Sequence, residues 1–243
     1  MNHPRVLVYC PLSPVGTRIY DRTYQSIMAL HWYAPLDIVW GRQDMEKHPG
    51  DYGGKHNLME KYRQARRLAL YGGYDALLTV ESDMIVPRLT LERLTRLEAD
   101  IAYGLYSSRH MNHPWLAFSE IDDNFVGETF SNDPELCKSV WGSAVETFGI
   151  GMGCTLIWRH VLERIDFRCP DMAVANDWFL ALDAKEAGFR QVHDCGVVCG
   201  HIDNSLPDPK IYWPLPDGGC REEAWDKSHQ LSLEVMRINS GSV

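Results

Sequence analysis

Two acidic residues separated by one position follow an apolar segment near residue 80. The segment DALLTV, residues 75–80, is followed at once by Glu81, Ser82 and Asp83. Residues i and i+2 of an extended chain point the same way, so both carboxylates leave the strand end together. Open α/β sheets bind ligands at the carboxyl ends of their strands, where two acids suit a divalent cation that completes its shell with substrate phosphates. A solvated turn with a helix cap is the alternative interpretation.

A further acid stands at the start of a predicted helix, in the segment NDWFLALDAKEAGF, residues 176–189. A carboxylate at this place, Asp177, interacts favourably with the helix dipole and can cap backbone amides. The functional alternative is a general base that faces the sheet edge where Glu81 and Asp83 emerge. The sequence supports both interpretations.

The segment HDCGVVCGH, residues 193–201, contains four residues of the types that bind zinc. If the segment is a strand, His193 and His201 lie roughly 26 Å apart at ~3.3 Å per residue. A single zinc ion needs all its ligands within about 2.3 Å, so one closed zinc site fails. The cysteines are then small core residues, whereas His201, beside Gly200 at the end of the run, is free to act as one further metal ligand.

Three glycines alternate with other residues in GIGMGC, residues 149–154. Their spacing and late position do not match the dinucleotide-binding fingerprint, and the chain has neither a P-loop motif nor a GxSxG motif. Such glycines let the backbone approach a ligand closely or form a tight turn.

These residues need a framework, and the chain alternates short apolar runs with helical patterns. Strands are expected at residues 5–10, 36–40, 75–80, 100–107 and 191–202, and helices at 20–33, 56–70, 89–99 and 176–189. Regular structure is also expected over 149–165, and a last amphipathic helix near 221–237. This alternation predicts an α/β fold with a mostly parallel central sheet flanked by helices.

We expect one Rossmann-like domain over residues 1–205, with a Pro-rich segment and a helix over 206–243 packed on it as an appendage. Residues 108–147 show no sustained period and form an irregular insertion that follows the strand at 100–107. The insertion contains Trp115, Phe118 and Trp141, large apolar side chains that either stack on an acceptor or pin the loop to the domain.

Composition excludes several classes of protein. The chain has 243 residues, with 24 Lys and Arg against 33 Asp and Glu, and this net charge of −9 argues against a protein that mainly grips nucleic-acid phosphates. No apolar run approaches the roughly 18–20 residues that span a membrane. The N-terminus does not resemble a signal peptide, and the seven cysteines form no paired framework. We therefore expect reduced thiols and a cytoplasmic location.

Taken in order, these segments resemble the GT-A-fold glycosyltransferases, closest in style to the family 2-like group. YDALLTVESDM is similar to the segment that leads into the family's metal-binding DxD motif, with Glu81 in place of the first Asp. The family's glycine-containing loop, which closes on donor and acceptor, is resembled by GIGMGCTLIWRHVLERI. The segment that bears the family's acidic pair is resembled by NDWFLALDAKEAGF, and the strand that ends in the metal-ligand histidine is resembled by CGHI.

The resemblance implies a role for each matching residue. Asp83 and His201 would bind a divalent metal, Mn²⁺ or Mg²⁺, and Glu81 would contact the donor ribose or a metal-bound water. Asp177 would be the base. The donor contacts implied by the resemblance also include Pro11, Ser13, Arg63 or Arg66, Ser82 and Gly151.

The implied activity is transfer of a sugar from a nucleotide-diphosphate sugar to an acceptor hydroxyl. The acceptor would be a carbohydrate, a small molecule or another hydroxyl group, modified DNA included. Two alternatives are a sugar-1-phosphate nucleotidyltransferase and a non-catalytic protein that binds nucleotide-sugars or carbohydrates. A pure binder would not hydrolyse the donor.

Overall fold

The computed structural model describes most of the chain. The described residues are 3–12, 18–41, 55–109, 112, 114–122, 124, 126–149, 151–170, 176–203, 205, 207–226 and 230–232. Ser13, and most of the loop between the strand at 36–40 and the helix at 56–70, lie outside these residues.

Within the described residues, the central sheet has seven strands in the order β3-β1-β4-β11-β6-β12-β9. Their bounds are β1 Val6–Pro11, β3 Asp37–Gly41, β4 Ala76–Val80, β6 Ile101–Leu105, β9 Ala144–Glu146, β11 Cys154–Trp158 and β12 Gln191–Val198. β1 pairs in parallel with β3 and β4, and β6 with β12. β11 lies antiparallel between β4 and β6, and β9 is antiparallel to β12. The α/β prediction is confirmed: β3, β1, β4, β6 and β12 run in one direction, while β11 and β9 run in the opposite direction and make the sheet mixed.

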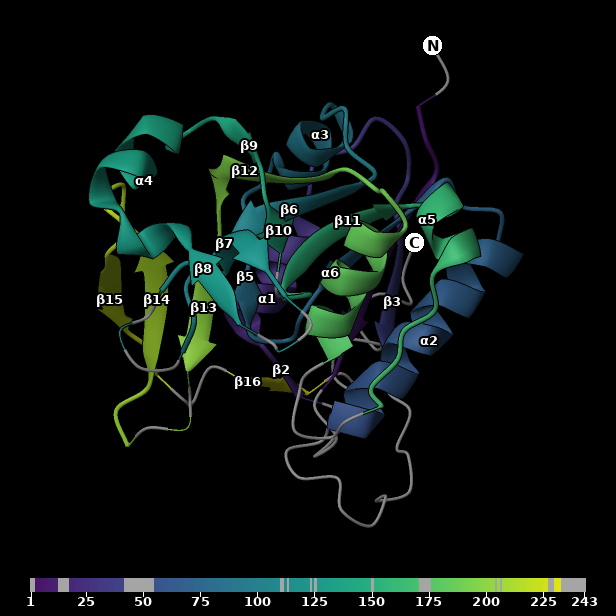
Figure 1. The fold of residues 1–243 in the computed structure, drawn as a ribbon. Coiled ribbons are helices and arrows are strands. Elements are labelled where there is room, and N and C mark those ends of the chain that lie inside the picture. Colours follow the sequence, from purple (N-terminus) through teal and green to yellow (C-terminus); the bar gives the residue numbers. More distant parts are fainter. Residues whose placement is uncertain are drawn as a thin grey trace.

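Helices cover both faces of this sheet (Figure 1). Successive residues of β1 alternate between two cores, because side chains of a strand point to opposite faces. Val6 and Val8 pack with α1 (Asp21–Met28) and α3 (Thr90–Thr95). Leu7 and Tyr9 pack with α2 (Lys55–Tyr71), α5 (Arg159–Arg164) and α6 (Asn176–Glu186). Burial on both faces explains why β4 and β6 are almost entirely apolar, with Thr79 the exception in β4.

The insertion over 108–147 is more regular than its sequence suggests. It contains β7 (Ala117–Ile121), β8 (Gly127–Thr129), a short 3-10 helix η1 (Phe130–Asn132) and α4 (Pro134–Val140), and it ends in β9. β10 (Phe148–Gly149), β7 and β8 form a small antiparallel sheet. The Asp133 side chain caps α4 by accepting hydrogen bonds from two backbone amides. These elements are short, so no helical or strand period persists long enough to appear in the sequence.

A second sheet replaces the expected C-terminal helix. β14 (Lys210–Pro214) lies between β13 (Gly200–Asp203) and β15 (Cys220–Ala224), and β5 (Met84–Ile85) completes the order β15-β14-β13-β5. β16 (Gln230–Ser232) pairs with β2 (Arg18–Tyr20). The prediction of a helix near 221–237 is therefore wrong wherever the structure describes that range. Pairing with β14 outweighs the helical propensity of the glutamates in β15.

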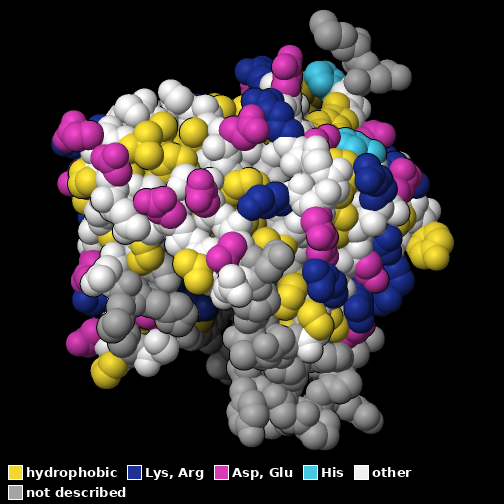
Figure 2. Space-filling model, in the orientation of Figure 1, with side chains coloured by type: hydrophobic (Ala, Val, Ile, Leu, Met, Phe, Trp, Pro, Cys, Tyr) yellow, Lys and Arg dark blue, Asp and Glu magenta, His cyan; other side chains and the backbone are white. Residues whose placement is uncertain are grey.

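No helix among the described residues is both long and apolar enough to cross a bilayer. Lysine, arginine and acidic side chains are interspersed over the face shown in Figure 2. The described side chains of that face thus present no extended patch of one sign.

Candidate active site

Several elements converge at the carboxyl edge of the central sheet. Glu81 and Asp83 follow β4, and the backbone amide of Glu81 donates to the carbonyl of Gly153 at 3.1 Å. Because β11 runs antiparallel, the glycine segment that precedes it lies at the same edge. This edge is where α/β sheets bind ligands, so the topology supports the position predicted from the sequence.

Asp83 and His201 are brought together by the pairing of β5 with β13. The backbone amide of Ile202 donates to the carbonyl of Asp83 at 2.8 Å. His201 Nε2 lies 3.8 Å from Asp83 Oδ2, and these side chains are only 7% and 16% exposed. His201 Nδ1 is 2.8 Å from the carbonyl oxygen of Ser107 and donates to it, since a carbonyl can only accept. The imidazole is thereby held with Nε2 towards the carboxylate.

The Nε2 atom of His201 is buried and has no hydrogen-bond partner among the described residues. Burial lowers the pKa of His201, although the charge of Asp83 opposes this shift. A neutral imidazole whose other nitrogen binds a carbonyl is the usual state of a metal-ligating histidine. Two donors about 2.1 Å from one ion are separated by roughly 3.0–3.5 Å, so the 3.8 Å separation fits a shared cation after a small shift.

The third predicted ligand, Glu81, is hydrogen-bonded to a tyrosine of another element. Tyr62, on α2, donates a 2.6 Å hydrogen bond to Oε1 of Glu81. Among the described residues no group of three His, Cys, Asp or Glu side chains is arranged to hold a metal ion. Asp83 and His201 lie next to each other, and the predicted set of three is not assembled among the described residues. Phosphates and water commonly complete the shell of a bound cation.

The carboxyl group of Glu81 is surrounded by groups that disfavour its ionised form. Burial raises the pKa of Glu81 to about 7, and the charges of Asp83 and Asp177 add to the shift, while Tyr62 and Arg109 oppose it. Burial and the charge of Glu81 in turn raise the pKa values of Tyr62 and Tyr106 well above their ordinary range. A carboxyl group titrating near neutrality is typical of functional sites.

Asp177 lies at the start of α6, close enough for its charge to raise the pKa values of Glu81, Tyr62 and Tyr106. Its Oδ1 accepts a 2.8 Å hydrogen bond from the backbone amide of Trp178. Asp177 thus lies within electrostatic reach of Glu81, and its roles as a helix cap and as a general base both stay predictions.

Two charged residues of the site were missed by the sequence analysis. Arg109, in the insertion, donates from Nη1 to Asp83 Oδ2 at 2.7 Å. Asp203 lies two residues after His201 on β13, and its charge raises the pKa of Arg109. Burial raises the pKa of Asp203, but hydrogen bonds from Ser205 and the charges of Arg109 and His201 together outweigh it and lower that pKa overall. The spacing His201-x-Asp203 repeats that of Glu81-x-Asp83, and this repetition could have identified Asp203 from the sequence. No sequence pattern marks Arg109 as part of the site.

The glycine segment accommodates tyrosines of the protein itself. A Cβ atom built on Gly151 would lie 1.9 Å from the hydroxyl oxygen of Tyr106, and one on Gly149 would lie 2.4 Å from the ring of Tyr103. Gly151 also has φ 150°, a conformation that favours glycine. The close approach expected for a ligand is thus made by side chains of β6 and the residue after it. Contact of Gly151 with a donor stays a prediction.

The remaining predicted donor residues lie around this edge or on α2. Pro11 ends β1, and Ser82 lies between the two acids. Arg63 and Arg66 donate to the carbonyl oxygens of Phe167 and Leu162, at 2.7 and 2.6 Å, and so hold α5 and the segment after it against α2. The geometry gives both arginines a structural role, and their contact with a nucleotide stays a prediction.

The aromatic residues of the insertion do not form an open acceptor surface at Trp115. Its side chain is fully buried, and its ring lies 5.8 Å from that of Trp141. The expectation that Trp115 stacks on an acceptor is wrong, because this indole fills the core beneath the insertion. The alternative, in which it pins the loop to the domain, is confirmed.

Comparison with known proteins gives the fold but no family. No protein-family model matches the chain. A197 from STIV superposes with a TM-score of 0.56 and 15% identity, covering 91% of this chain and 95% of that one. HddC from Yersinia pseudotuberculosis gives a TM-score of 0.40 at 11% identity, over 84% of this chain and 95% of that one. Sulfhydryl oxidase 2 from Homo sapiens is 27% identical over 125 residues, which are 46% of this chain and 16% of that protein's length. The likeness to A197 shows a shared α/β fold.

Proposed function

We propose that the chain is a divalent-cation-dependent glycosyltransferase that moves a sugar from a nucleoside-diphosphate sugar to an acceptor hydroxyl. The observation that carries the proposal is the pair formed by Asp83 and His201. The Nε2 atom of His201, which has no hydrogen-bond partner in the part of the chain that the structure describes, faces a carboxylate oxygen at the sheet edge where α/β folds bind ligands. A mixed nitrogen and oxygen donor set favours Mn²⁺ or another transition metal over Mg²⁺, which prefers oxygen ligands.

Each residue of the site then has a chemical task. Asp83 and His201 hold the cation, whose contribution is to stabilise negative charge on the diphosphate leaving group. Asp177 accepts the proton of the acceptor hydroxyl as that oxygen bonds to the anomeric carbon. The bond from that carbon to the diphosphate breaks, and the diphosphate leaves with the electron pair. Tyr62 orients the Glu81 carboxyl group beside this reaction.

The test compares two equally buried, ion-paired aspartates. Asp83 pairs with Arg109 and is 16% exposed, and Asp183 pairs with Arg168 and is 18% exposed. Thermal unfolding of the wild-type chain, Asp83→Asn and Asp183→Asn is followed with Mn²⁺ and a panel of nucleoside-diphosphate sugars. At about 100 times Kd, a ligand stabilises the folded chain by roughly 2.7 kcal/mol, which raises Tm by several degrees.

We expect at least one sugar nucleotide to raise Tm in the wild type and in Asp183→Asn, but not in Asp83→Asn or with EDTA present. Release of the nucleoside diphosphate from that donor then distinguishes an enzyme from a binding protein. A shift that survives both EDTA and Asp83→Asn would contradict the assignment of the cation pair.

A further inference from the structure

Arg109 shares one carboxylate oxygen with the proposed cation ligands. Its Nη1 lies 2.7 Å from Asp83 Oδ2, and the same oxygen lies 3.8 Å from His201 Nε2. A cation held between His201 and Asp83 would therefore meet the guanidinium at this oxygen. Two positive charges so close together repel each other, which makes the guanidinium and a divalent cation competitors for Asp83.

The surroundings of Arg109 are strongly acidic. The charge of Asp83, with smaller contributions from Glu81 and Asp203, raises the pKa of Arg109. A guanidinium stays charged at any ordinary pH and presents a planar fork of donors that matches carboxylates and phosphates. Arg109 thus supplies positive charge at the place where a diphosphate would have to approach several carboxylates.

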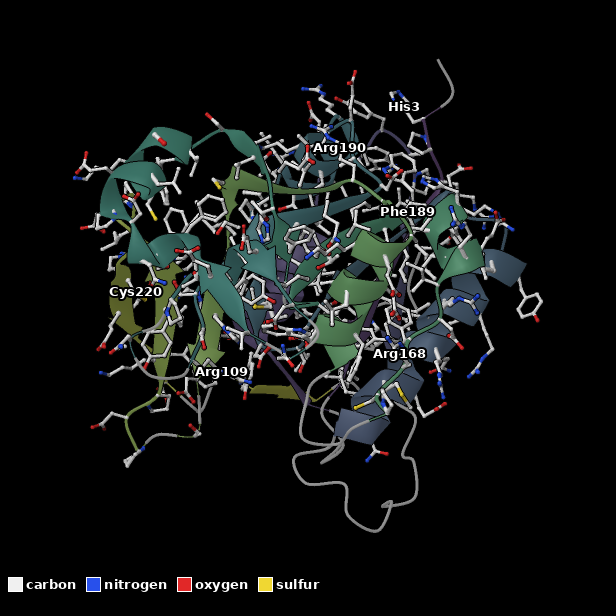
Figure 3. All side chains as sticks on the ribbon, viewed as in Figure 1. His3, Arg109, Arg168, Phe189, Arg190 and Cys220 are labelled. Atoms are coloured by element: carbon white, nitrogen blue, oxygen red, sulfur yellow. The ribbon has the colours of Figure 1, made fainter. Side chains whose placement is uncertain are left out.

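The Arg109 side chain has room to change partners. It is 39% exposed, compared with 16% for Asp83, so the guanidinium is the solvent-facing member of the pair. Figure 3 shows it beside β13, at the edge that carries the acids. A long side chain at this exposure can turn from a carboxylate to a phosphate that binds next to the cation.

We propose that Arg109 is a phosphate-binding residue of this site, which exchanges its ion pair with Asp83 for the donor's diphosphate when a divalent cation binds Asp83. The proposal rests on the proposed function. It adds that cation binding has to displace a charge already paired with Asp83, and that the displaced charge then contacts the substrate.

A second ion pair serves as the matched control. Arg168 donates to both carboxylate oxygens of Asp183 at 2.8 and 2.5 Å, and its side chain is 47% exposed. In Figure 3 it lies on the α2 side of the molecule, away from Arg109. Arg168→Gln therefore removes the same charge from a similar pair outside the site.

The experiment measures binding of Mn²⁺ alone, and then of pyrophosphate at saturating Mn²⁺, by isothermal titration calorimetry on the full chain. Arg109→Gln should bind Mn²⁺ at least tenfold more tightly than the wild type, because its competitor is gone, and pyrophosphate at least tenfold more weakly. Arg109→Lys keeps the charge but loses the fork, so its Mn²⁺ affinity should stay within about threefold while pyrophosphate binding weakens. Arg168→Gln should match the wild type in both titrations.

Equal Mn²⁺ affinities of the wild type and Arg109→Gln would overturn the proposal and leave the cation-dependent function standing. Weaker Mn²⁺ binding by Arg109→Gln would also overturn it, because Arg109 would then merely position Asp83. If neither protein binds Mn²⁺, both this proposal and the proposed cation requirement fail. Should Arg109→Gln not fold, as judged by circular dichroism, Arg109→Lys decides the matter: weaker pyrophosphate binding at a Mn²⁺ affinity close to that of the wild type supports the proposal, and unchanged pyrophosphate binding overturns it.

Discussion

Burial of the His193 imidazole makes the stability of the protein depend on pH. The side chain is 1% exposed, stacks on Tyr103 with ring centroids 4.8 Å apart, and pairs its Nδ1 with the hydroxyl of Thr147 at 2.6 Å. Burial lowers the pKa of His193 to about 3, although a hydrogen bond with the backbone of Leu116 opposes the shift. The folded chain therefore keeps this imidazole neutral at every ordinary pH.

The sign of the effect follows from the two protonation states. In the unfolded chain a histidine has a pKa of about 6.5, so the unfolded state takes up a proton as the pH falls below that value. The folded state does not take it up until about pH 3. Stability is therefore lost as the pH falls from about 6.5 towards 3. At about 1.36 kcal/mol per unit, the loss at pH 5 is roughly 2 kcal/mol relative to pH 7.5.

Urea unfolding of the wild type and of His193→Gln at pH 7.5 and pH 5 measures the contribution of His193 to the pH dependence of the free energy of unfolding. Other titrating groups contribute equally to both proteins, so the difference between their pH dependences isolates His193. The variant should lose about 2 kcal/mol less than the wild type between the two pH values, even if its stability at pH 7.5 is lower. His3→Gln, which removes an exposed histidine, is the control and should behave as the wild type. An unchanged pH dependence in His193→Gln would refute the argument.

Three further predictions follow from the site and the insertion. Asp177→Asn should cost no more than about 1 kcal/mol of stability yet lower the transfer rate by about 10²–10⁴-fold at unchanged donor affinity, as checked by urea unfolding and steady-state kinetics. Gly151→Ala should lower stability by about 1–3 kcal/mol, since its Cβ would lie 1.9 Å from the Tyr106 hydroxyl. Adding Tyr106→Phe should restore part of that loss in the same unfolding assay. Trp115→Ala should cost about 3–5 kcal/mol because the side chain is fully buried, and donor hydrolysis should fall together with Tm.

The core of the fold could be predicted because its strands are buried on both faces. Segments such as 75–80 and 100–107 read as continuous apolar runs, and helical patterns separate most of them. The direction of a strand leaves no such trace. β11 runs antiparallel between β4 and β6, and the chain passes from β6 to β11 through the insertion over 108–147. The prediction of a C-terminal helix failed for a different reason. Pairing with β14 holds β15 as a strand, and the intrinsic propensity of its residues does not.

The sequence predicts those positions in the candidate site that depend only on the local geometry of a strand. The alternation of side chains along an extended chain places Glu81 and Asp83 at one strand end, and the end of the 191–202 run brings His201 to the same place. The Glu81 carboxyl group accepts a hydrogen bond from Tyr62, which lies 19 residues earlier, on α2. Arg109 reaches Asp83 from the start of the insertion, 26 residues later. Neither contact has a sequence spacing that a local rule could detect.

The carboxyl edge of the central sheet carries more acidic than basic side chains among the described residues of the site, and this excess lowers the stability of the fold. Among the described residues, the charges of Glu81, Asp83, Asp177 and Asp203 act on one another or on the guanidinium of Arg109. Partly buried like charges destabilise a fold, and the pKa of Glu81 is raised first by burial and further by the charges of Asp83 and Asp177. A sequence selected for stability alone would replace one or more of these acids with neutral side chains. Such an excess of negative charge is stabilised by binding a cation, so the electrostatic cost to the fold and the proposed cation-dependent activity have the same origin.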